Sequence, residues 1–506
     1  MTKGTLAAIT VTANPSGLAP GTYYGRVDVS APEALDSPQS FEVQLNVAAS
    51  DNQTVMPSTA GLIFVVSQSA NPIPQTFTLS TLSNAALKVT TGAEYGQSGH
   101  WFTVGSSTTS FTSAQPITQT VTVNTTGLAP GIYDGIVHQF ESTAKKDYPV
   151  RVLLVVTPSS GVCTPTKLLP VLTSLTTGFQ VTVGDPVPVA AQLLDDCGAT
   201  VSSGSLVAKL SADDAAILMS PLGGGRWSGT WQPRAATSQG TVTLTAMSPT
   251  SLQGFSSTVG SVVANTKATI IYAGGVVSAA SLKASAPLAP GAFITIVGTN
   301  LASATATASS DPLPTTLSGT RVLLGGQPLP LQFVSAGQIN AIVPYGATMN
   351  QTQQLLIESS GVYSFPETVS VAATSPAVFT QTGSGKGAGA IVVTKADGTQ
   401  FVASAVSPAT AGDVLSIYCS GLGAVNPALA EGAVAPSSPL SRTGNAVTVT
   451  IGGQSTEVLF AGLAPGAAGL YQVNVLVPSG IAPDANVPVV VTSAGAISGP
   501  VTIAIQ

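Results

Sequence analysis

The feature that most constrains this chain is an internal repeat. The run Gly-Leu-Ala-Pro-Gly-x-Tyr-x-Gly occurs at Gly17–Gly25 and again at Gly127–Gly135. Around it, Val11–Val27 and Val121–Val137 share eleven of seventeen residues at a constant offset. A repeat of about a hundred residues indicates a string of similar modules.

The repeated motif also predicts local structure. Proline presets φ and glycine accepts a positive φ, so the Pro-Gly pair predicts a turn. The tyrosine that follows would open the next strand, as a corner tyrosine does in β-sandwiches.

Period-two alternation of apolar and polar residues dominates the chain. One row is Phe41, Val43, Leu45 and Val47, and another is Tyr148, Val150, Val152, Leu154 and Val156. Such strands are expected to have one buried and one solvated face. Clusters of turn residues separate the strands every eight to twelve residues, and helical periodicity is almost absent. This predicts an all-β tandem array of immunoglobulin-like β-sandwich domains.

We expect five modules. Residues 1–49 would be a partial sandwich, and residues 52–157, 160–266, 271–378 and 381–506 would be complete ones. The second should contain seven strands, near Leu62–Ser67, Thr76–Thr81, Leu87–Thr91, Trp101–Val104, Thr118–Asn124, Ile132–Phe140 and Tyr148–Val156.

Several motifs resemble known families. Trp101–Val104, the repeated motif and the closing strand are similar to the BACON family, and the first module matches only the last strands of that pattern. The third module has Gly184-Asp185-Pro186 and the segment Gly225–Pro233, and it resembles bacterial immunoglobulin-like or macroglobulin-like surface domains.

The fourth and fifth modules repeat each other. Gly291–Leu301 parallels Gly412–Leu422, and Gln338–Pro344 parallels Gln472–Pro478. They resemble IPT/TIG-type units and, together, an uncharacterised C-terminal domain family of secreted acidobacterial (Solibacter-type) proteins. That resemblance implies fold and location and carries no activity.

Composition limits the function classes. Only 8% of residues are charged, the net charge is −6, and the 16 Lys and Arg form no basic stripe, so no nucleic-acid partner is expected. No stretch of eighteen apolar residues occurs, so a membrane-spanning helix is not expected either. We expect an exported protein at the cell surface or outside the cell.

Few residues of the sequence are arranged in a way that could support catalysis or metal binding. The two histidines, His100 and His138, have no serine or cysteine elbow nearby, and the pairs Asp195-Asp196 and Asp213-Asp214 would point to opposite strand faces. We therefore predict no enzyme activity, no cofactor and no metal site, with calcium at a loop as the alternative.

Cys163 and Cys197 lie in the third module, 34 residues apart, and are predicted to form a disulfide rather than two buried thiols. Cys419 is predicted to be a buried small apolar residue. Candidate carbohydrate-binding residues are Trp101 with Tyr95, and Trp227 with Trp231, because aromatic rings can stack on pyranose faces. The favoured interpretation is that these tryptophans fill sandwich cores.

Gln338 with Asn340, and Gln472 with Asn474, each share one strand face. We expect their amides to bond a neighbouring loop's backbone.

The predicted function is non-enzymatic: adhesion, spacing or matrix formation at the cell surface, with polysaccharide or other surface proteins as partners. Alternatives are a carbohydrate-binding protein, a surface-filament subunit, or the accessory region of a larger secreted enzyme. The first module, with strands at Ile9–Thr12, Thr22–Ser30 and Phe41–Val47, would have an open edge. We expect either a truncated start, which would also account for the absent signal peptide, or strand donation by a partner and self-association.

Overall fold

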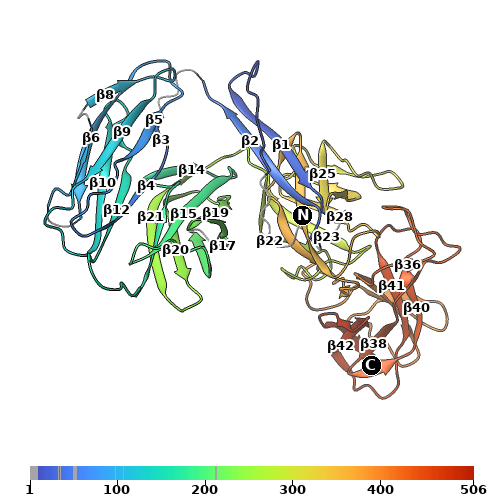
Figure 1. The fold of residues 1–506 in the computed structure, drawn as a ribbon. Coiled ribbons are helices and arrows are strands. Elements are labelled where there is room, and N and C mark those ends of the chain that lie inside the picture. The colour runs from blue at the N-terminus through green and yellow to red at the C-terminus, as the bar shows by residue number, and fades with distance from the viewer. Residues whose placement is uncertain are drawn as a thin grey trace. The chain divides into compact units, whose positions relative to one another are not determined.

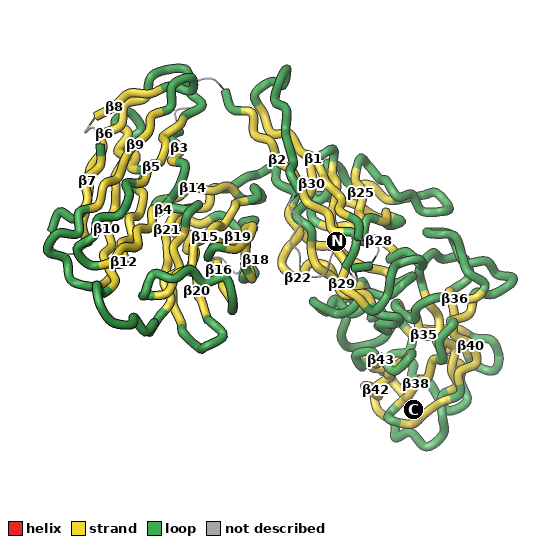
Figure 2. The backbone as a smooth tube through the Cα atoms, viewed as in Figure 1, coloured by secondary structure: helices red, strands yellow, loops and turns green. Residues whose placement is uncertain are grey.

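The computed structural model describes residues 9–31, 33–34, 36–49, 54–96, 99–105, 108–210 and 214–506. In these ranges the chain forms strands, turns and loops without a helix (Figure 1, Figure 2). The all-β tandem sandwich fold is confirmed. The chain divides into two compact units, Met1–Tyr23 with Gln44–Asn265, and Tyr24–Val43 with Thr266–Gln506. No described helix is long and apolar enough to cross a membrane.

The first copy of the repeat forms a two-stranded sheet, β1 (Gly21–Val29) and β2 (Gln39–Val47). The prediction of a strand at Ile9–Thr12 is wrong, because these residues have no regular structure. A strand needs a hydrogen-bonding partner. The equivalent segment of the second copy pairs with strands on both sides, whereas Ile9 and Val11 are exposed.

The second sandwich contains all seven expected strands. One sheet has the order β3-β5-β9-β7 and the other β4-β12-β10-β6-β8, with β11 beside β10. Strand β4 runs parallel to β12, and the remaining pairs are antiparallel. The bounds are β3 (Met56–Pro57), β4 (Gly61–Ser67), β5 (Gln75–Ser80), β6 (Leu87–Tyr95), β7 (Phe102–Val104), β8 (Thr108–Phe111), β9 (Ile117–Val123), β10 (Gly131–Glu141), β11 (Lys146–Asp147) and β12 (Val150–Thr157).

The third sandwich pairs the sheet β13-β15-β19-β18 with the sheet β14-β21-β20-β16-β17. The bounds are β13 (Leu168–Leu172), β14 (Phe179–Thr182), β15 (Val187–Asp195), β16 (Ser205–Leu210), β17 (Ile217–Leu218), β18 (Ser220–Gly223), β19 (Arg226–Trp231), β20 (Thr237–Met247) and β21 (Gln253–Val263).

The fourth sandwich has the sheets β22-β23-β28-β27-β24 and β26-β25-β29-β30, with β31 beside β29. The bounds are β22 (Ile270–Ser278), β23 (Phe293–Thr299), β24 (Ala306–Thr307), β25 (Thr320–Leu324), β26 (Gln327–Pro328), β27 (Leu331–Val334), β28 (Gln338–Ile342), β29 (Gln351–Ser359), β30 (Val362–Tyr363) and β31 (Glu367–Val371).

The fifth sandwich has the sheets β34-β33-β35-β41-β40-β37-β36, with β32 beside β35, and β39-β38-β42-β43, with β44 beside β42. The bounds are β32 (Ala377–Val378), β33 (Ile391–Thr394), β34 (Gln400–Val402), β35 (Val414–Ser420), β36 (Val425–Asn426), β37 (Arg442–Thr443), β38 (Val447–Ile451), β39 (Gln454–Thr456), β40 (Val458–Leu463), β41 (Tyr471–Leu476), β42 (Asp484–Ser493), β43 (Ala496–Ile497) and β44 (Val501–Ile505).

The repeated motif folds the same way twice, with one correction. The glycine after proline is nearly extended, with φ at 159° in Gly131, and the left-handed φ belongs to the first glycine, at 78° in Gly17 and 79° in Gly127. Each sits third in a four-residue turn that its leucine N–H closes, at 3.1 Å and 3.0 Å, which is the glycine position of a type II turn. The following tyrosine hydroxyl bonds back to the alanine carbonyl of the motif in both copies.

Candidate functional site

All three tryptophans lie in sandwich cores. Trp101 and Trp227 are each 2% exposed, and Trp231 is 1% exposed. The Trp227 indole N–H donates to the Val201 carbonyl at 2.9 Å, and that of Trp231 to Asp214 at 2.8 Å. A buried indole has no free face for a pyranose ring. The candidate carbohydrate contacts at these residues are therefore corrected to core positions.

Tyr95 lies at the edge of the same core as Trp101. Its hydroxyl donates to the Phe102 carbonyl at 2.8 Å, and burial raises its pKa. Its ring meets the Trp101 ring at 67° and packs on His100 and Phe102. Tyr95 and Trp101 thus do not form the coplanar platform that sugar stacking would need.

The cysteines occupy two different environments. Cys163 and Cys197 form a disulfide with Cα atoms 5.8 Å apart, which ties the segment entering the third sandwich to the loop after β15. Cys419 is fully buried in β35, and burial raises its thiol pKa. A thiol that is both inaccessible and hard to ionise is unsuited to nucleophilic chemistry.

The predicted carboxylate pairs serve the backbone and neighbouring side chains. Asp195 accepts the N–H groups of Cys197 and Ala199, and Asp196 accepts the hydroxyl and N–H of Thr166. Asp213 lies outside the described residues, and its neighbour Asp214 bonds Trp231. Within the described ranges no cluster of three His, Cys, Asp or Glu could hold a metal ion.

The repeated Gln-x-Asn motif makes an unexpected contact. Gln338 donates to Asn340 at 2.8 Å, and Gln472 donates to Asn474 at the same distance. The expectation that these amides bond a loop backbone is therefore wrong. The two residues of each pair point to the same strand face, so each side chain finds its partner two positions away.

The sequence analysis did not predict that the outer face of β12 contacts the third sandwich. We expected this face to be solvated, yet Leu153 and Val155 are buried and pack with Val171 of the third sandwich. The unbroken apolar run from Val152 to Val156 was the available signal, because a strand buried on both faces loses its alternation.

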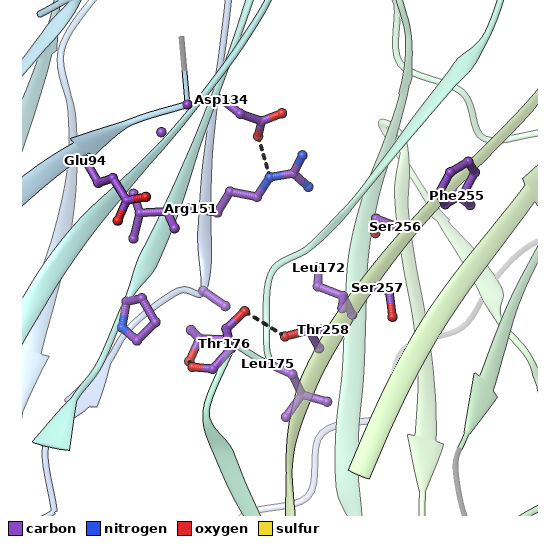
Figure 3. A pocket seen from close by; sticks show the side chains of 16 residues that line it. Glu94, Asp134, Arg151, Leu172, Leu175, Thr176, Phe255, Ser256, Ser257 and Thr258 are labelled. Carbon is purple, nitrogen blue, oxygen red and sulfur yellow. Dashed lines mark hydrogen bonds and ion pairs between the residues drawn. The ribbon is translucent and has the colours of Figure 1, made fainter. Parts of the chain in front are cut away.

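A cavity of about 400 Å³ opens where this apolar contact ends, at Arg151 (Figure 3). Glu94, Asp134 and Arg151 enter from the second sandwich, and β21 supplies the opposite side (Figure 3). The lining from the third sandwich comprises Leu172, Leu175, Thr176, Thr177, Phe255, Ser256, Ser257 and Thr258. The cavity therefore exists only because two sandwiches meet.

Ion pairs organise the second sandwich's side of the cavity. Arg151 Nε donates to Asp134 Oδ1 at 2.6 Å. His138 lies between Asp147, 2.6 Å from Nδ1, and Glu94, 3.0 Å from Nε2. Burial alone would lower the His138 pKa, but the two carboxylates outweigh that effect and raise it. Glu94 thus links the histidine to the cavity lining.

The two sandwiches that form this cavity are also joined through the backbone. The Ala60 N–H donates to the Thr173 carbonyl at 2.9 Å. Gly61 fits only without a side chain, because a Cβ there would lie 2.9 Å from the Leu172 carbonyl oxygen. The cavity walls are accordingly held at one spacing.

The fourth and fifth sandwiches are joined by an analogous contact. Tyr471, fully buried, places its hydroxyl 2.5 Å from the Gly423 carbonyl and 3.3 Å from that of Pro290. The Phe293 N–H donates to Ser420 Oγ at 2.8 Å in the same buried region. Backbone and side-chain bonds thus cross from one sandwich to the next.

A carboxylate reinforces this second junction. Glu431, from the fifth sandwich, accepts the backbone N–H groups of Tyr345 and Gly346 at 2.9 Å and 3.2 Å. Burial, followed by the nearby Glu431 charge, raises the pKa of Tyr345. The junction consequently contains paired polar groups as well as apolar contact.

Comparison with known proteins shows distant similarity only. No protein-family profile matches the chain, and no curated protein sequence matches it. Among solved structures, the D0-D1 domain of intimin matches at TM-score 0.23 and 9% identity, covering 41% of this chain and 98% of its own. Fibronectin(III)-like modules of Clostridium thermocellum CbhA match at 0.16 and 15%, covering 42% and 95%.

A third similar structure is the Bacteroides ovatus protein SGBP-B in complex with a mixed-linkage heptasaccharide. It matches at TM-score 0.16 and 12% identity, covering 82% of this chain and 87% of its own. Scores this low transfer no function or ligand from these structures.

Proposed function

We propose that this chain is a non-enzymatic, exported protein whose joined sandwiches act as a stiff spacer in a cell-surface or extracellular assembly. The observation that carries the proposal is the pair of built junctions. One contains Leu153, Val155 and Val171, and the other contains Tyr471 and Glu431. Sandwiches connected only by free linkers would turn independently, whereas buried side chains across a junction hold one orientation.

The disulfide and the composition support an oxidising location outside the cytoplasm. Disulfides persist in secreted, periplasmic and surface proteins and are rare in the cytosol. Cys163 and Cys197 form such a bond in the structure. Protease treatment of intact cells of the source organism should release fragments of the chain, and complete protection of the chain would contradict a surface location.

Stiffness can be measured on the full chain by double electron–electron resonance. Spin labels at the exposed positions of Thr352→Cys and Ser455→Cys would report the distance between the fourth and fifth sandwiches. We expect one narrow distance distribution, because Tyr471 and Glu431 hold the junction. Cys419 should not take up label, because it is fully buried.

A wedge variant sharpens this test. At Gly469 a Cβ would lie 2.7 Å from Ile342 Cδ1, so Gly469→Val should broaden or shift the distribution. Gly337→Val is the control, since nothing lies within 4 Å of a Cβ built there. A broad distribution in the unmodified protein would show that the junction is not stiff and would contradict the spacer role.

A further inference from the structure

We propose that the cavity between the second and third sandwiches binds a neutral oligosaccharide. The inference does not depend on the spacer role, since a spacer needs no ligand. The lining of this cavity combines planar polar side chains, hydroxyls, an exposed aromatic ring and an apolar floor. That combination matches a sugar, which presents adjacent hydroxyls on its edge and C–H groups on its faces.

The cavity has the position and size of a preformed ligand site. Its volume of about 400 Å³ lies within the usual range for small-molecule pockets, which occur preferentially where domains meet. The Ala60–Thr173 bond and the buried contact of Leu153 hold the two walls together. A ligand would therefore find the site formed and lose little free energy in arranging it.

Its polar groups have unused hydrogen-bonding capacity. Beyond the Nε bond to Asp134, the Arg151 guanidinium makes no hydrogen bond within the described part of the chain. Arg151 can only donate and the carboxylates can only accept, so together they suit hydroxyl groups that do both.

Charge selects the class of ligand. The cavity lining contains one cationic group, Arg151, and two carboxylates, Glu94 and Asp134. An anionic ligand would approach the two carboxylates, and a cationic ligand would approach the guanidinium. Because like charges at short distance are unfavourable, a neutral polyol is preferred over either.

Phe255 supplies the face for stacking that the buried tryptophans lack. Its side chain is 82% exposed although it lines the cavity, and Figure 3 shows it on the β21 side of the site. Leu172 and Leu175 add apolar surface on the same side of the junction. Small-molecule pockets are lined mainly by apolar and aromatic side chains, with a few polar groups that fix the orientation of the ligand.

The test is titration calorimetry of the full chain with four neutral probes: cellotetraose, laminaritetraose, xylotetraose and mannotetraose. Tetragalacturonate serves as the anionic comparison. We expect at least one neutral probe to bind at millimolar concentration or below. Phe255→Ala should weaken that binding about tenfold or more, and Arg151→Gln should weaken it similarly.

Phe41→Ala is the matched control, because Phe41 is also an exposed phenylalanine and lies outside the cavity lining. It should leave the affinity unchanged. Because Phe255 is exposed, its replacement should not lower the melting temperature. Scanning calorimetry measures this. The proposal is overturned if no neutral probe binds, if only tetragalacturonate binds, or if both cavity variants bind as tightly as the unmodified chain.

Discussion

The two copies of the repeat have the same local structure and very different burial. The two copies can be aligned through one glycine in each: Gly25 lies opposite Val43, and Gly135 pairs with Val152. The residues Phe41, Val43 and Leu45 therefore occupy the places that Val150, Val152 and Leu154 have in the second copy. In the second copy these three side chains are 0% exposed, whereas Phe41 is 56% exposed and Val43 and Leu45 are half-buried. Turn and strand pairing are therefore local properties, and burial is supplied by the rest of a sandwich.

The largest difference between the copies should appear at the paired leucines. Leu154→Ala leaves a cavity in a closed core and should lower the free energy of unfolding of the second sandwich by about 2–5 kcal/mol. Leu45→Ala should cost about 1 kcal/mol, because less apolar surface is buried there. Hydrogen exchange on the full chain measures both locally. Equal costs at the two positions would show that the copies are equally buried.

Replacing the corresponding glycine of each copy by alanine tests the same difference in burial, because the substitution adds a methyl group. A Cβ at Gly135 would lie 2.6 Å from Phe102 Cε1 and 3.1 Å from Trp101 Cζ2. Gly135→Ala should therefore cost about 1–3 kcal/mol by overpacking. At Gly25 the nearest atom is 3.9 Å away, so Gly25→Ala should change stability by less than about 0.5 kcal/mol. A tolerated Gly135→Ala, seen as an unchanged melting curve, would mean that the core is looser than the structure shows.

The corner tyrosines should behave alike, which sharpens the claim that the motif is local. Tyr133 donates to the Ala129 carbonyl at 2.8 Å and Tyr23 to that of Ala19 at 3.0 Å. Replacing either by phenylalanine should cost about 1 kcal/mol, the usual net value of one hydrogen bond. If exchange rates near Gly17 stay unchanged in Tyr23→Phe while those near Gly127 rise in Tyr133→Phe, the corner depends on the whole sandwich.

The smallest expected effect is a pH dependence confined to the second copy. His138 stands where the first copy has Asp28, and its carboxylate partners raise its pKa. Its stabilising contribution is complete below the unfolded-state pKa of about 6.5 and is lost as pH rises through the higher folded-state value. Because a third of the side chain is exposed, the effect should be small.

Melting curves at several pH values measure this effect. The transition of the second sandwich should move to lower temperature as pH rises above about 6.5, and His138→Gln should remove that slope. If the melting temperature still falls with rising pH in His138→Gln, the pH dependence comes from another titratable group.

Much of the fold could be predicted from the sequence. The seven expected strands of the second sandwich follow from period-two alternation, whereas the repeated turn forms at the first glycine of the motif and not at the predicted Pro-Gly pair. The strand expected at Ile9–Thr12 failed because alternation does not supply a partner strand. The burial of Trp101, Trp227 and Trp231 agrees with the preferred core interpretation and leaves them no ligand face.

The cavity could not be predicted in the same way. Phe255, Arg151 and Glu94 are far apart in the sequence, and no motif connects them. Their meeting depends on β12 turning its outer face toward the third sandwich.

The sequence by itself determined where the expected strands of the second sandwich lie, because alternation acts over a few residues. Only the tertiary structure decided which surfaces are covered. The alternation predicts that Leu153 and Val155 face solvent, but the third sandwich buries them. Arg151 lines the cavity because it lies at the end of that contact. Burial is a property of the neighbours that a strand meets, and a single strand's sequence does not contain those neighbours.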